Sequence, residues 1–165
     1  MSNHVDWLPD LVTLADCDGK WEAYLNTIYE YFCDDFVRSK PAYKAKRFAL
    51  KRHPLYDGKE ATFWHLISEG PVEAGRLPDF RRCERIRWPR PMIEAIDSGN
   101  VCVWRNVRKR NERVVIALGD FSYVVILDDR EDYVLLWTAY FVEREHQRRK
   151  LEKEYHQWKK ESQNG

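Results

Sequence analysis

Four strand-length apolar segments follow one another in the second half of the chain, and they constrain the fold more than any other feature. Gly119-Asp120 and residues 128–132 supply turn-forming residues between them. Residues 123–127 are apolar on both faces, which is typical of a central strand. Strands joined by such short connections pair in antiparallel fashion. The sequence therefore predicts an antiparallel meander formed by residues 101–107, 113–119, 121–128 and 133–142.

Helices are predicted both before and after this meander in the sequence. Apolar residues recur at helical spacing over residues 20–37, with Asp18 as the expected N-cap. A short helix around residues 79–87 and another from about Pro91 should follow, because proline suits the first helical turn. The highly charged residues 143–161 predict a C-terminal helix with a thin apolar stripe.

The segment between these first two helical regions is predicted to be a β-hairpin. Residues 44–52 form one expected strand and residues 61–68 the other, and Asp57-Gly58 is a strong turn signal between them. The sum is an α+β fold, in which N-terminal helices pack on one side of a twisted antiparallel sheet and a charged helix ends the chain.

The length of 165 residues fits one compact domain covering residues 1–165. We expect a core at about residues 44–142, an N-terminal helical part at 1–40 and a C-terminal helix at 143–161. No run approaches the roughly 20 apolar residues of a membrane span. The four cysteines are scattered, as in proteins with reduced structural thiols. These features predict a cytoplasmic protein with no membrane contact.

Charge is unevenly distributed, although the formal net charge is only +1. Residues 1–40 carry 3 basic and 8 acidic side chains, whereas residues 41–90 carry 12 basic and 6 acidic ones. A basic middle favours an anionic ligand, and the acidic start is a candidate segment for docking beside it.

His53 and His65 lie in the predicted hairpin and are the candidates for proton transfer, because imidazoles titrate near neutral pH. His53 is expected at a sheet edge or a loop mouth, since Pro54 favours an extended residue before it. His65 is expected inside the second strand, which would hold it more rigidly. The alternatives are a hydrogen-bonded core His65 with a surface His53, or a zinc site. No cysteine or carboxylate falls at ligand spacing, so no metal or cofactor is predicted.

Cationic side chains accompany these histidines and are candidates for binding phosphate groups. Lys51 and Lys59 belong to the hairpin, and Arg82 and Arg85 to the helix that follows. We favour Arg85 for stabilising charge during phosphoryl transfer, because apolar neighbours bracket it. Arg108 lies in a basic loop that can touch a nucleic-acid backbone. A solvated helix face is the alternative for most of these arginines.

The last predicted strand carries two hydroxyl groups two residues apart. Strand alternation places Thr138 and Tyr140 on one face together with Val134 and Leu136. The two hydroxyls can hydrogen-bond one phosphate, and the phenol ring can stack on a base. Ordinary strand residues with high β propensity are the alternative.

Three motifs occur in a fixed order along the chain: KRHP followed by DGKEATFWHL, then RRCERIRWPRPMIE, then YVLLWTAYFV. Together they resemble the phage-associated branch of the barnase–EndoU–colicin–RelE nuclease superfamily. The resemblance covers roughly residues 44–142 and implies N-terminal helices followed by a twisted antiparallel sheet. Members are commonly toxins that cut RNA without a metal, and a cognate antitoxin or immunity protein is implied with them. The implied catalytic positions are His53, His65, Arg85, Thr138 and Tyr140.

The expected function is therefore a metal-independent endoribonuclease acting on tRNA or mRNA. One histidine would accept the proton of a ribose 2′-OH and the other would protonate the leaving 5′-oxygen, which yields a 2′,3′-cyclic phosphate. A non-catalytic module of phage origin that binds RNA or a protein is the first alternative. A different enzyme, such as a metal-assisted hydrolase or a nucleotide-modifying transferase, is the second.

Overall fold

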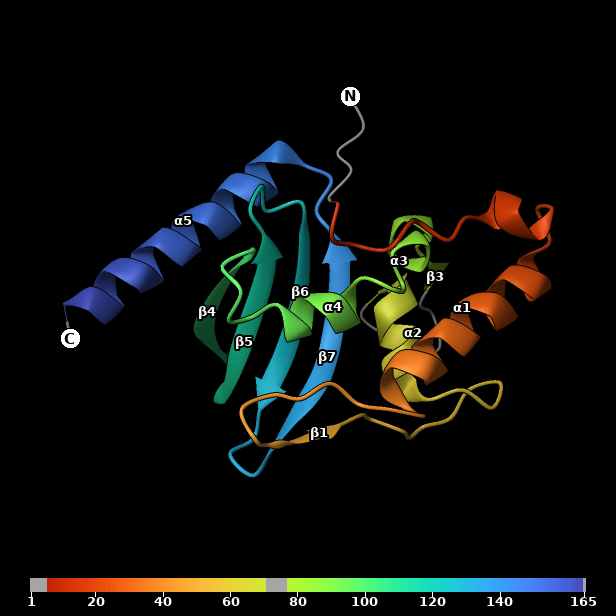
Figure 1. Ribbon diagram of the computed structural model, residues 1–165, viewed down its shortest axis with the longest axis horizontal. Coiled ribbons are helices and arrows are strands. Elements are labelled where there is room, and N and C mark those ends of the chain that lie inside the picture. The colour runs from red at the N-terminus through yellow and green to blue at the C-terminus, as the bar shows by residue number, and fades with distance from the viewer. Residues whose placement is uncertain (1–5, 71–76, 165) are drawn as a thin grey trace.

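The computed structural model describes residues 6–70 and 77–164 and has the predicted α+β architecture. Figure 1 shows a central sheet with α4 in front of it, α2 beside β7 and α1 beyond α2, and a long helix, α5, that extends to the C-terminus. A short 3-10 helix, Leu14–Cys17, precedes α1. The elements in chain order are α1 (Trp21–Phe36), β1 (Arg47–Ala49), α2 (Ala61–Ile67), β2 (Ser68–Glu69), β3 (Leu77–Pro78), α3 (Phe80–Glu84), α4 (Pro89–Glu94), β4 (Val101–Arg108), β5 (Asn111–Leu118), β6 (Tyr123–Asp129), β7 (Tyr133–Phe141) and α5 (Glu145–Gln163).

The predicted meander is confirmed, because β4, β5, β6 and β7 pair antiparallel in chain order. The sheet is nevertheless mixed. β1 lies along the outer edge of β7 and runs parallel to it, with Phe48 opposite Val134. The strand order is β1-β7-β6-β5-β4, so β1 shields only the first residues of β7 and leaves the rest of that edge to other elements.

The predicted hairpin is wrong, because its second strand is the helix α2. Phe63, Leu66 and Ile67 are buried at the helical spacing i, i+3, i+4. The Thr62 hydroxyl accepts a hydrogen bond from the Lys51 backbone N–H at 2.7 Å, which ties the start of α2 to the preceding chain. His65 therefore lies on the last turn of a helix and not within a strand.

The turn inside that segment is confirmed even though the flanking strands are not. Asp57 and Gly58 both have positive φ, at 52° and 69°, and the backbones of Tyr56 and Lys59 bond reciprocally across them. This geometry is the two-residue turn that Asp-Gly favours. A turn signal is local, whereas strand pairing depends on what the rest of the chain offers.

The helices begin close to where the sequence places them, with different caps. The N-cap of α1 is Lys20, and Asp18 instead ends the preceding 3-10 helix with φ 56°. Asp79 caps α3 through its carboxylate, which accepts from the backbone N–H groups of Arg81 and Arg82. The next helix, α4, starts at Pro89 rather than at about Pro91.

The sheet has a core on each face. We call the face that packs against α1 and α4 the helical face and the opposite one the α5 face. The larger core lies on the helical face, where α1 and α2 contribute buried aromatic side chains such as Phe32 and Phe63 against Val125 and Leu136. Burial of this apolar surface is the main stabilising term.

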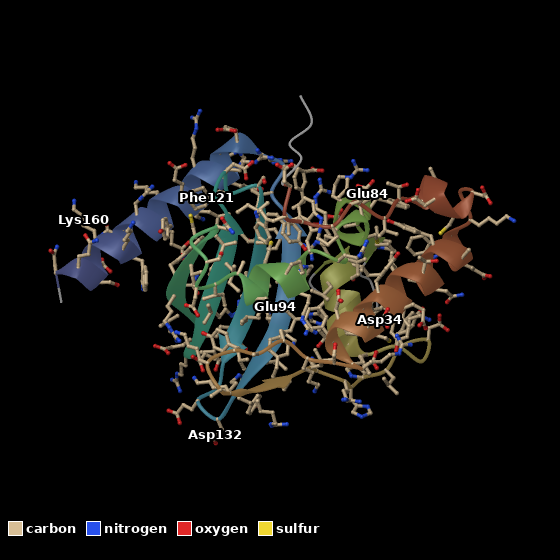
Figure 2. The ribbon with its side chains drawn as sticks, viewed as in Figure 1. Asp34, Glu84, Glu94, Phe121, Asp132 and Lys160 are labelled. Carbon is tan, nitrogen blue, oxygen red and sulfur yellow. The ribbon has the colours of Figure 1, made fainter. Side chains whose placement is uncertain are left out.

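The α5 face has a smaller core, which the C-terminal helix completes. Its centre is Trp104, which is fully buried, and Tyr155 of α5 lies with its ring centroid 5.5 Å from that indole. The Tyr155 ring is also 6.0 Å from Phe121, which Figure 2 labels beside α5. The thin apolar stripe predicted for this helix is therefore the seam along which it packs, with Leu151 and Trp158 as its other members.

Across residues 6–70 and 77–164, no helix combines the length and the apolar character needed to cross a membrane.

Candidate functional site

Arg82 joins three elements at the edge of β7 that β1 leaves uncovered. Its side chain is only 12% exposed. The Nη1 group donates to the backbone oxygen of Ser68 at 2.9 Å, to that of His65 at 3.3 Å and to the Thr138 hydroxyl at 3.5 Å. These bonds connect α3 to the end of α2, to β2 and to β7. Arg82 thus contacts two of the predicted site positions, through the backbone oxygen of His65 and the hydroxyl of Thr138.

Two carboxylates partly offset the charge of this arginine. Asp79 lies 3.7 Å from its Nε and Glu69 lies 3.9 Å from its Nη2. The Nε group is buried and makes no hydrogen bond to the residues that the structure describes. A buried guanidinium with incomplete hydrogen bonding is suited to donate to an anionic oxygen, since charge-assisted hydrogen bonds to phosphate are among the strong ones.

The two hydroxyl-bearing residues of β7 lie at this guanidinium. The Thr138 hydroxyl donates to the His65 backbone oxygen at 3.0 Å, and the Tyr140 ring lies beneath the Arg82 guanidinium at 5.5 Å from its centroid. Thr138 and Tyr140 share a face, as predicted. That face is the α5 face, because Tyr140 packs against the Trp104 core.

The prediction that Thr138 and Tyr140 share a face with Leu136 is wrong, because β7 contains a β-bulge. Thr138 pairs with Ile126, while Leu136 pairs with Leu127, so Trp137 is an extra residue in β7. One inserted residue moves every following side chain to the other face. Val134 and Leu136 therefore remain on the helical face, and the hydroxyls turn away from them.

His65 and Trp137 form an aromatic pair beside this cluster. Both side chains are half-buried, and their ring centroids are 5.7 Å apart in an edge-on arrangement. The Arg113 guanidinium lies over the Trp137 ring of this pair, 5.0 Å from its centroid. Arg113 is held by Asp128, which is 1% exposed and also binds Arg130 at 3.0 Å. The site therefore contains a second fixed cation that the sequence did not reveal.

Sequence reasoning missed Arg113, Asp128 and Trp137 because their relation is made by the sheet. Arg113 and Asp128 face each other across β5 and β6. The bulge in β7 places Trp137 next to His65. The one available signal in the sequence was a charged residue, Arg113 or Asp128, at the end of each of two otherwise apolar strand segments.

His53 lies elsewhere in the fold. It is exposed in the loop between β1 and α2. The backbone oxygens of Lys51 and Arg52 accept from the N–H groups of Thr62 and Ala61. The loop thus runs beside the start of α2, whereas His65 lies at its end.

Two other predicted phosphate-binding cations pack against aromatic rings within the fold. Lys59 is 9% exposed, lies 5.2 Å from the Tyr29 ring and pairs with Asp57 at 3.4 Å. Arg85 stacks on Phe141 at 4.1 Å and on Trp88 at 5.1 Å, and burial lowers the pKa of its guanidinium.

Arg85 therefore lies on the other side of β7 from Arg82. Arg108 ends β4 at the opposite edge of the sheet, and its side chain lies outside the described part of the chain.

Chemically, this edge of β7 offers a guanidinium in contact with a hydroxyl and a phenol ring. The His65 imidazole lies against Trp137, the residue next to Thr138. We name this set of residues the β7-edge site: His65, Arg82, Trp137, Thr138 and Tyr140. Within residues 6–70 and 77–164, no three His, Cys, Asp or Glu side chains are grouped so that they could hold a metal ion.

Comparison of the sequence with protein-family models gives no match, and comparisons with curated proteins and with solved structures give none either. The chemistry of the β7-edge site is therefore the basis for assigning a function.

Proposed function

We propose that the protein is a metal-independent endoribonuclease whose reaction takes place at the β7-edge site. The observation that carries the proposal is the convergence of His65, Arg82, Thr138 and Tyr140 from α2, α3 and β7 at one edge of the sheet. Phosphoryl transfer needs a base, an acid and fixed positive charge, and these residue types supply all three.

In this mechanism His65 accepts the proton of the ribose 2′-OH. The 2′-oxygen then forms a bond to phosphorus while the bond from phosphorus to the 5′-oxygen breaks, which leaves a 2′,3′-cyclic phosphate. Arg82 and Thr138 hold the non-bridging oxygens, where negative charge grows. Electrostatic stabilisation of this kind is commonly the largest contribution to such a reaction.

The second proton-transfer group is Tyr140 in this proposal and no longer His53. His53 is exposed in a loop at the other end of α2, whereas the Tyr140 ring lies 5.5 Å from a guanidinium. A nearby positive charge stabilises the phenolate that remains after the phenol has protonated the 5′-oxygen. His53 then serves, with Lys51, as part of the surface that meets RNA.

The test is cleavage of single-stranded RNA and of tRNA in the presence of EDTA, with analysis of the product ends. We expect wild-type protein to release 2′,3′-cyclic phosphate ends. His65→Asn should lower the rate by about 10²–10⁴-fold, the usual contribution of one acid–base group. Arg82→Lys should also lower it, because lysine cannot reproduce the guanidinium fork.

Matched controls separate chemistry from folding. His156→Asn removes an exposed histidine of α5, and Arg85→Lys alters the guanidinium on the other side of β7. Both should retain the rate, provided that circular dichroism shows a folded protein. The proposal is wrong if wild-type protein cuts no RNA in EDTA, or if His65→Asn is as active as His156→Asn.

A non-catalytic RNA-binding module remains the second candidate, and one observation favours it. Arg82 already donates to two backbone oxygens, which is a common structural role for a half-buried arginine. In that case RNA would be retained on a filter in a salt-dependent way without being cut. A carboxylate-rich inhibitor protein that covers the β7-edge site is the partner expected if the protein is a toxin.

A further inference from the structure

The turn before α2 presents a large aromatic side chain to solvent at a fixed position. Tyr56 is 70% exposed and its neighbour Leu55 is 52% exposed. The Tyr56 backbone bonds reciprocally with Lys59, and its carbonyl oxygen accepts a hydrogen bond from the Trp64 indole N–H at 3.0 Å. The Tyr56 ring meets the Trp64 ring edge-on at 5.3 Å. A side chain that is both held and exposed adds little to folding, and such a surface often marks a binding site.

This turn is connected to the β7-edge site through α2. Trp64 carries Tyr56, and the next residue, His65, contacts Trp137 at 5.7 Å. Consecutive residues of a helix are about 1.5 Å apart along its axis and about 100° apart around it. Trp64 therefore contacts the Tyr56 turn while His65 contacts Trp137, so that α2 joins the turn to the β7-edge site through two adjacent residues.

Positive charge lies both beside the Tyr56 turn and at the β7-edge site. Lys51, Arg52 and His53 precede the turn and are exposed, while Arg82 and Arg113 lie at that site. The two carboxylates of the turn region have partners. Asp57 pairs with Lys59, and Glu60 accepts a hydrogen bond from the Tyr29 hydroxyl at 2.8 Å.

We propose that the Tyr56 turn is a nucleobase-stacking platform and that the ligand is single-stranded RNA several nucleotides long. Unpaired bases stack on exposed aromatic rings, whereas the bases of a duplex are occupied by each other. The cations before the turn would meet the phosphate backbone. The position of the scissile phosphate rests on the proposed function, but the platform itself does not require cleavage.

The test measures binding without chemistry. Fluorescence anisotropy would follow a labelled, fully 2′-O-methylated oligonucleotide about eight nucleotides long, within the usual site size for single strands. A duplex of the same sequence is the comparison. We expect tighter binding of the single strand, and Tyr56→Ala should weaken that binding by on the order of tenfold.

Two variants control this measurement. Tyr56→Phe keeps the ring and should bind within about twofold of wild type, because stacking uses the ring face. Val107→Ala removes another strongly exposed apolar side chain, on the edge strand β4, and should leave binding unchanged.

The platform is wrong if Tyr56→Ala binds the single strand as well as wild type does, or if the duplex binds more tightly. These outcomes are distinct from failure of the proposed function. Tyr56-dependent binding without cleavage of unmodified RNA would support the platform and refute the nuclease. Cleavage that does not depend on Tyr56 would refute the platform alone.

Discussion

Arg82 and Arg85 are three positions apart, yet the end of β7 separates them. Arg82 lies over Tyr140 and Arg85 lies over Phe141, and consecutive strand residues point to opposite faces. Desolvation lowers the pKa of the Arg85 guanidinium, which is packed between aromatic rings. At the residue scale, Arg85, which has apolar neighbours in the sequence, packs against aromatic rings. The Nε groups of both arginines are buried without a hydrogen-bond partner in the described chain. Arg82 is the one suited to an anion because it lies beside the Thr138 hydroxyl and the Tyr140 phenol.

Asp35 on α1 is a half-buried carboxyl group whose titration should affect stability. Burial raises its pKa to about 6, although Arg90 and Arg87 act in the opposite direction. Between about pH 4 and pH 6 the folded state therefore keeps a proton that the unfolded chain releases. Stability should fall as the pH rises through this range, because the folded state binds more protons.

We expect Asp35→Asn to remove this dependence. Relative to wild type, the variant should gain about 1–2 kcal/mol in the free energy of unfolding between pH 4 and pH 7, after allowance for solvent screening. Urea denaturation at several pH values would measure it. Asp34→Asn, on the exposed side of the same helix and labelled in Figure 2, is the matched control. Equal pH profiles for the two variants would contradict the assignment.

At the scale of the element, β7 decides where the site forms. Its first residues pair with β1 on one side, and its later residues meet α2 and α3 through Thr138 and Tyr140. The extra residue Trp137 separates these two halves. Bulges often occur next to functional sites because they redirect side chains. The same strand can thus support the helical core and present hydroxyl groups on the α5 face.

The helix α5 should stabilise the sheet chiefly through its apolar seam. Tyr155 contacts both Trp104 and Phe121, whereas most other residues of the helix face solvent. We expect Tyr155→Ala to lower the free energy of unfolding by about 2–3 kcal/mol, since it removes a half-buried ring from a packed cluster. Thermal or urea unfolding would measure this change.

Lys153→Ala is the control within the same helix, because Lys153 is exposed. It should change stability by no more than about 0.5 kcal/mol. If Tyr155→Ala proved as stable as Lys153→Ala, the seam would not be the means by which α5 is attached.

At the scale of the whole molecule, two cores share one sheet. β1 is fastened to the meander by the parallel pairing with β7 and by Lys46, which binds Asp129 at 2.6 Å. Asp129 also binds Arg105 at 3.0 Å, and these partners outweigh its burial so that its pKa is lowered. Segments that are far apart in the sequence therefore depend on one another.

We expect the described chain to unfold as one unit, which would support the single-domain prediction. Tryptophan fluorescence and far-ultraviolet circular dichroism should give the same transition. Phe63→Ala in the helical core should shift both probes equally and cost about 3–5 kcal/mol. Two separate transitions, with only one of them shifted by Phe63→Ala, would show that the cores are independent.

The meander, the two flanking helices and the α+β class could be predicted because they depend on local patterns. Alternating and continuous apolar segments with turn residues between them indicate strands, and helical spacing indicates α1 and α5. The Asp57-Gly58 turn was equally local. The segment from 61 to 67 was not predictable in this way, because a short apolar run fits a buried helix as well as a strand.

The candidate site was predictable only in its residue types. Local patterns were enough to place a histidine, several cations and two hydroxyls in or near the sheet, because these residues occupy or border strongly patterned segments. Contacts between distant segments determine that Arg82 rather than Arg85 meets Tyr140, that Trp137 is bulged, and that His65 is on a helix. Packing across β7 and one inserted residue made those choices, and neither leaves a periodic trace in the sequence.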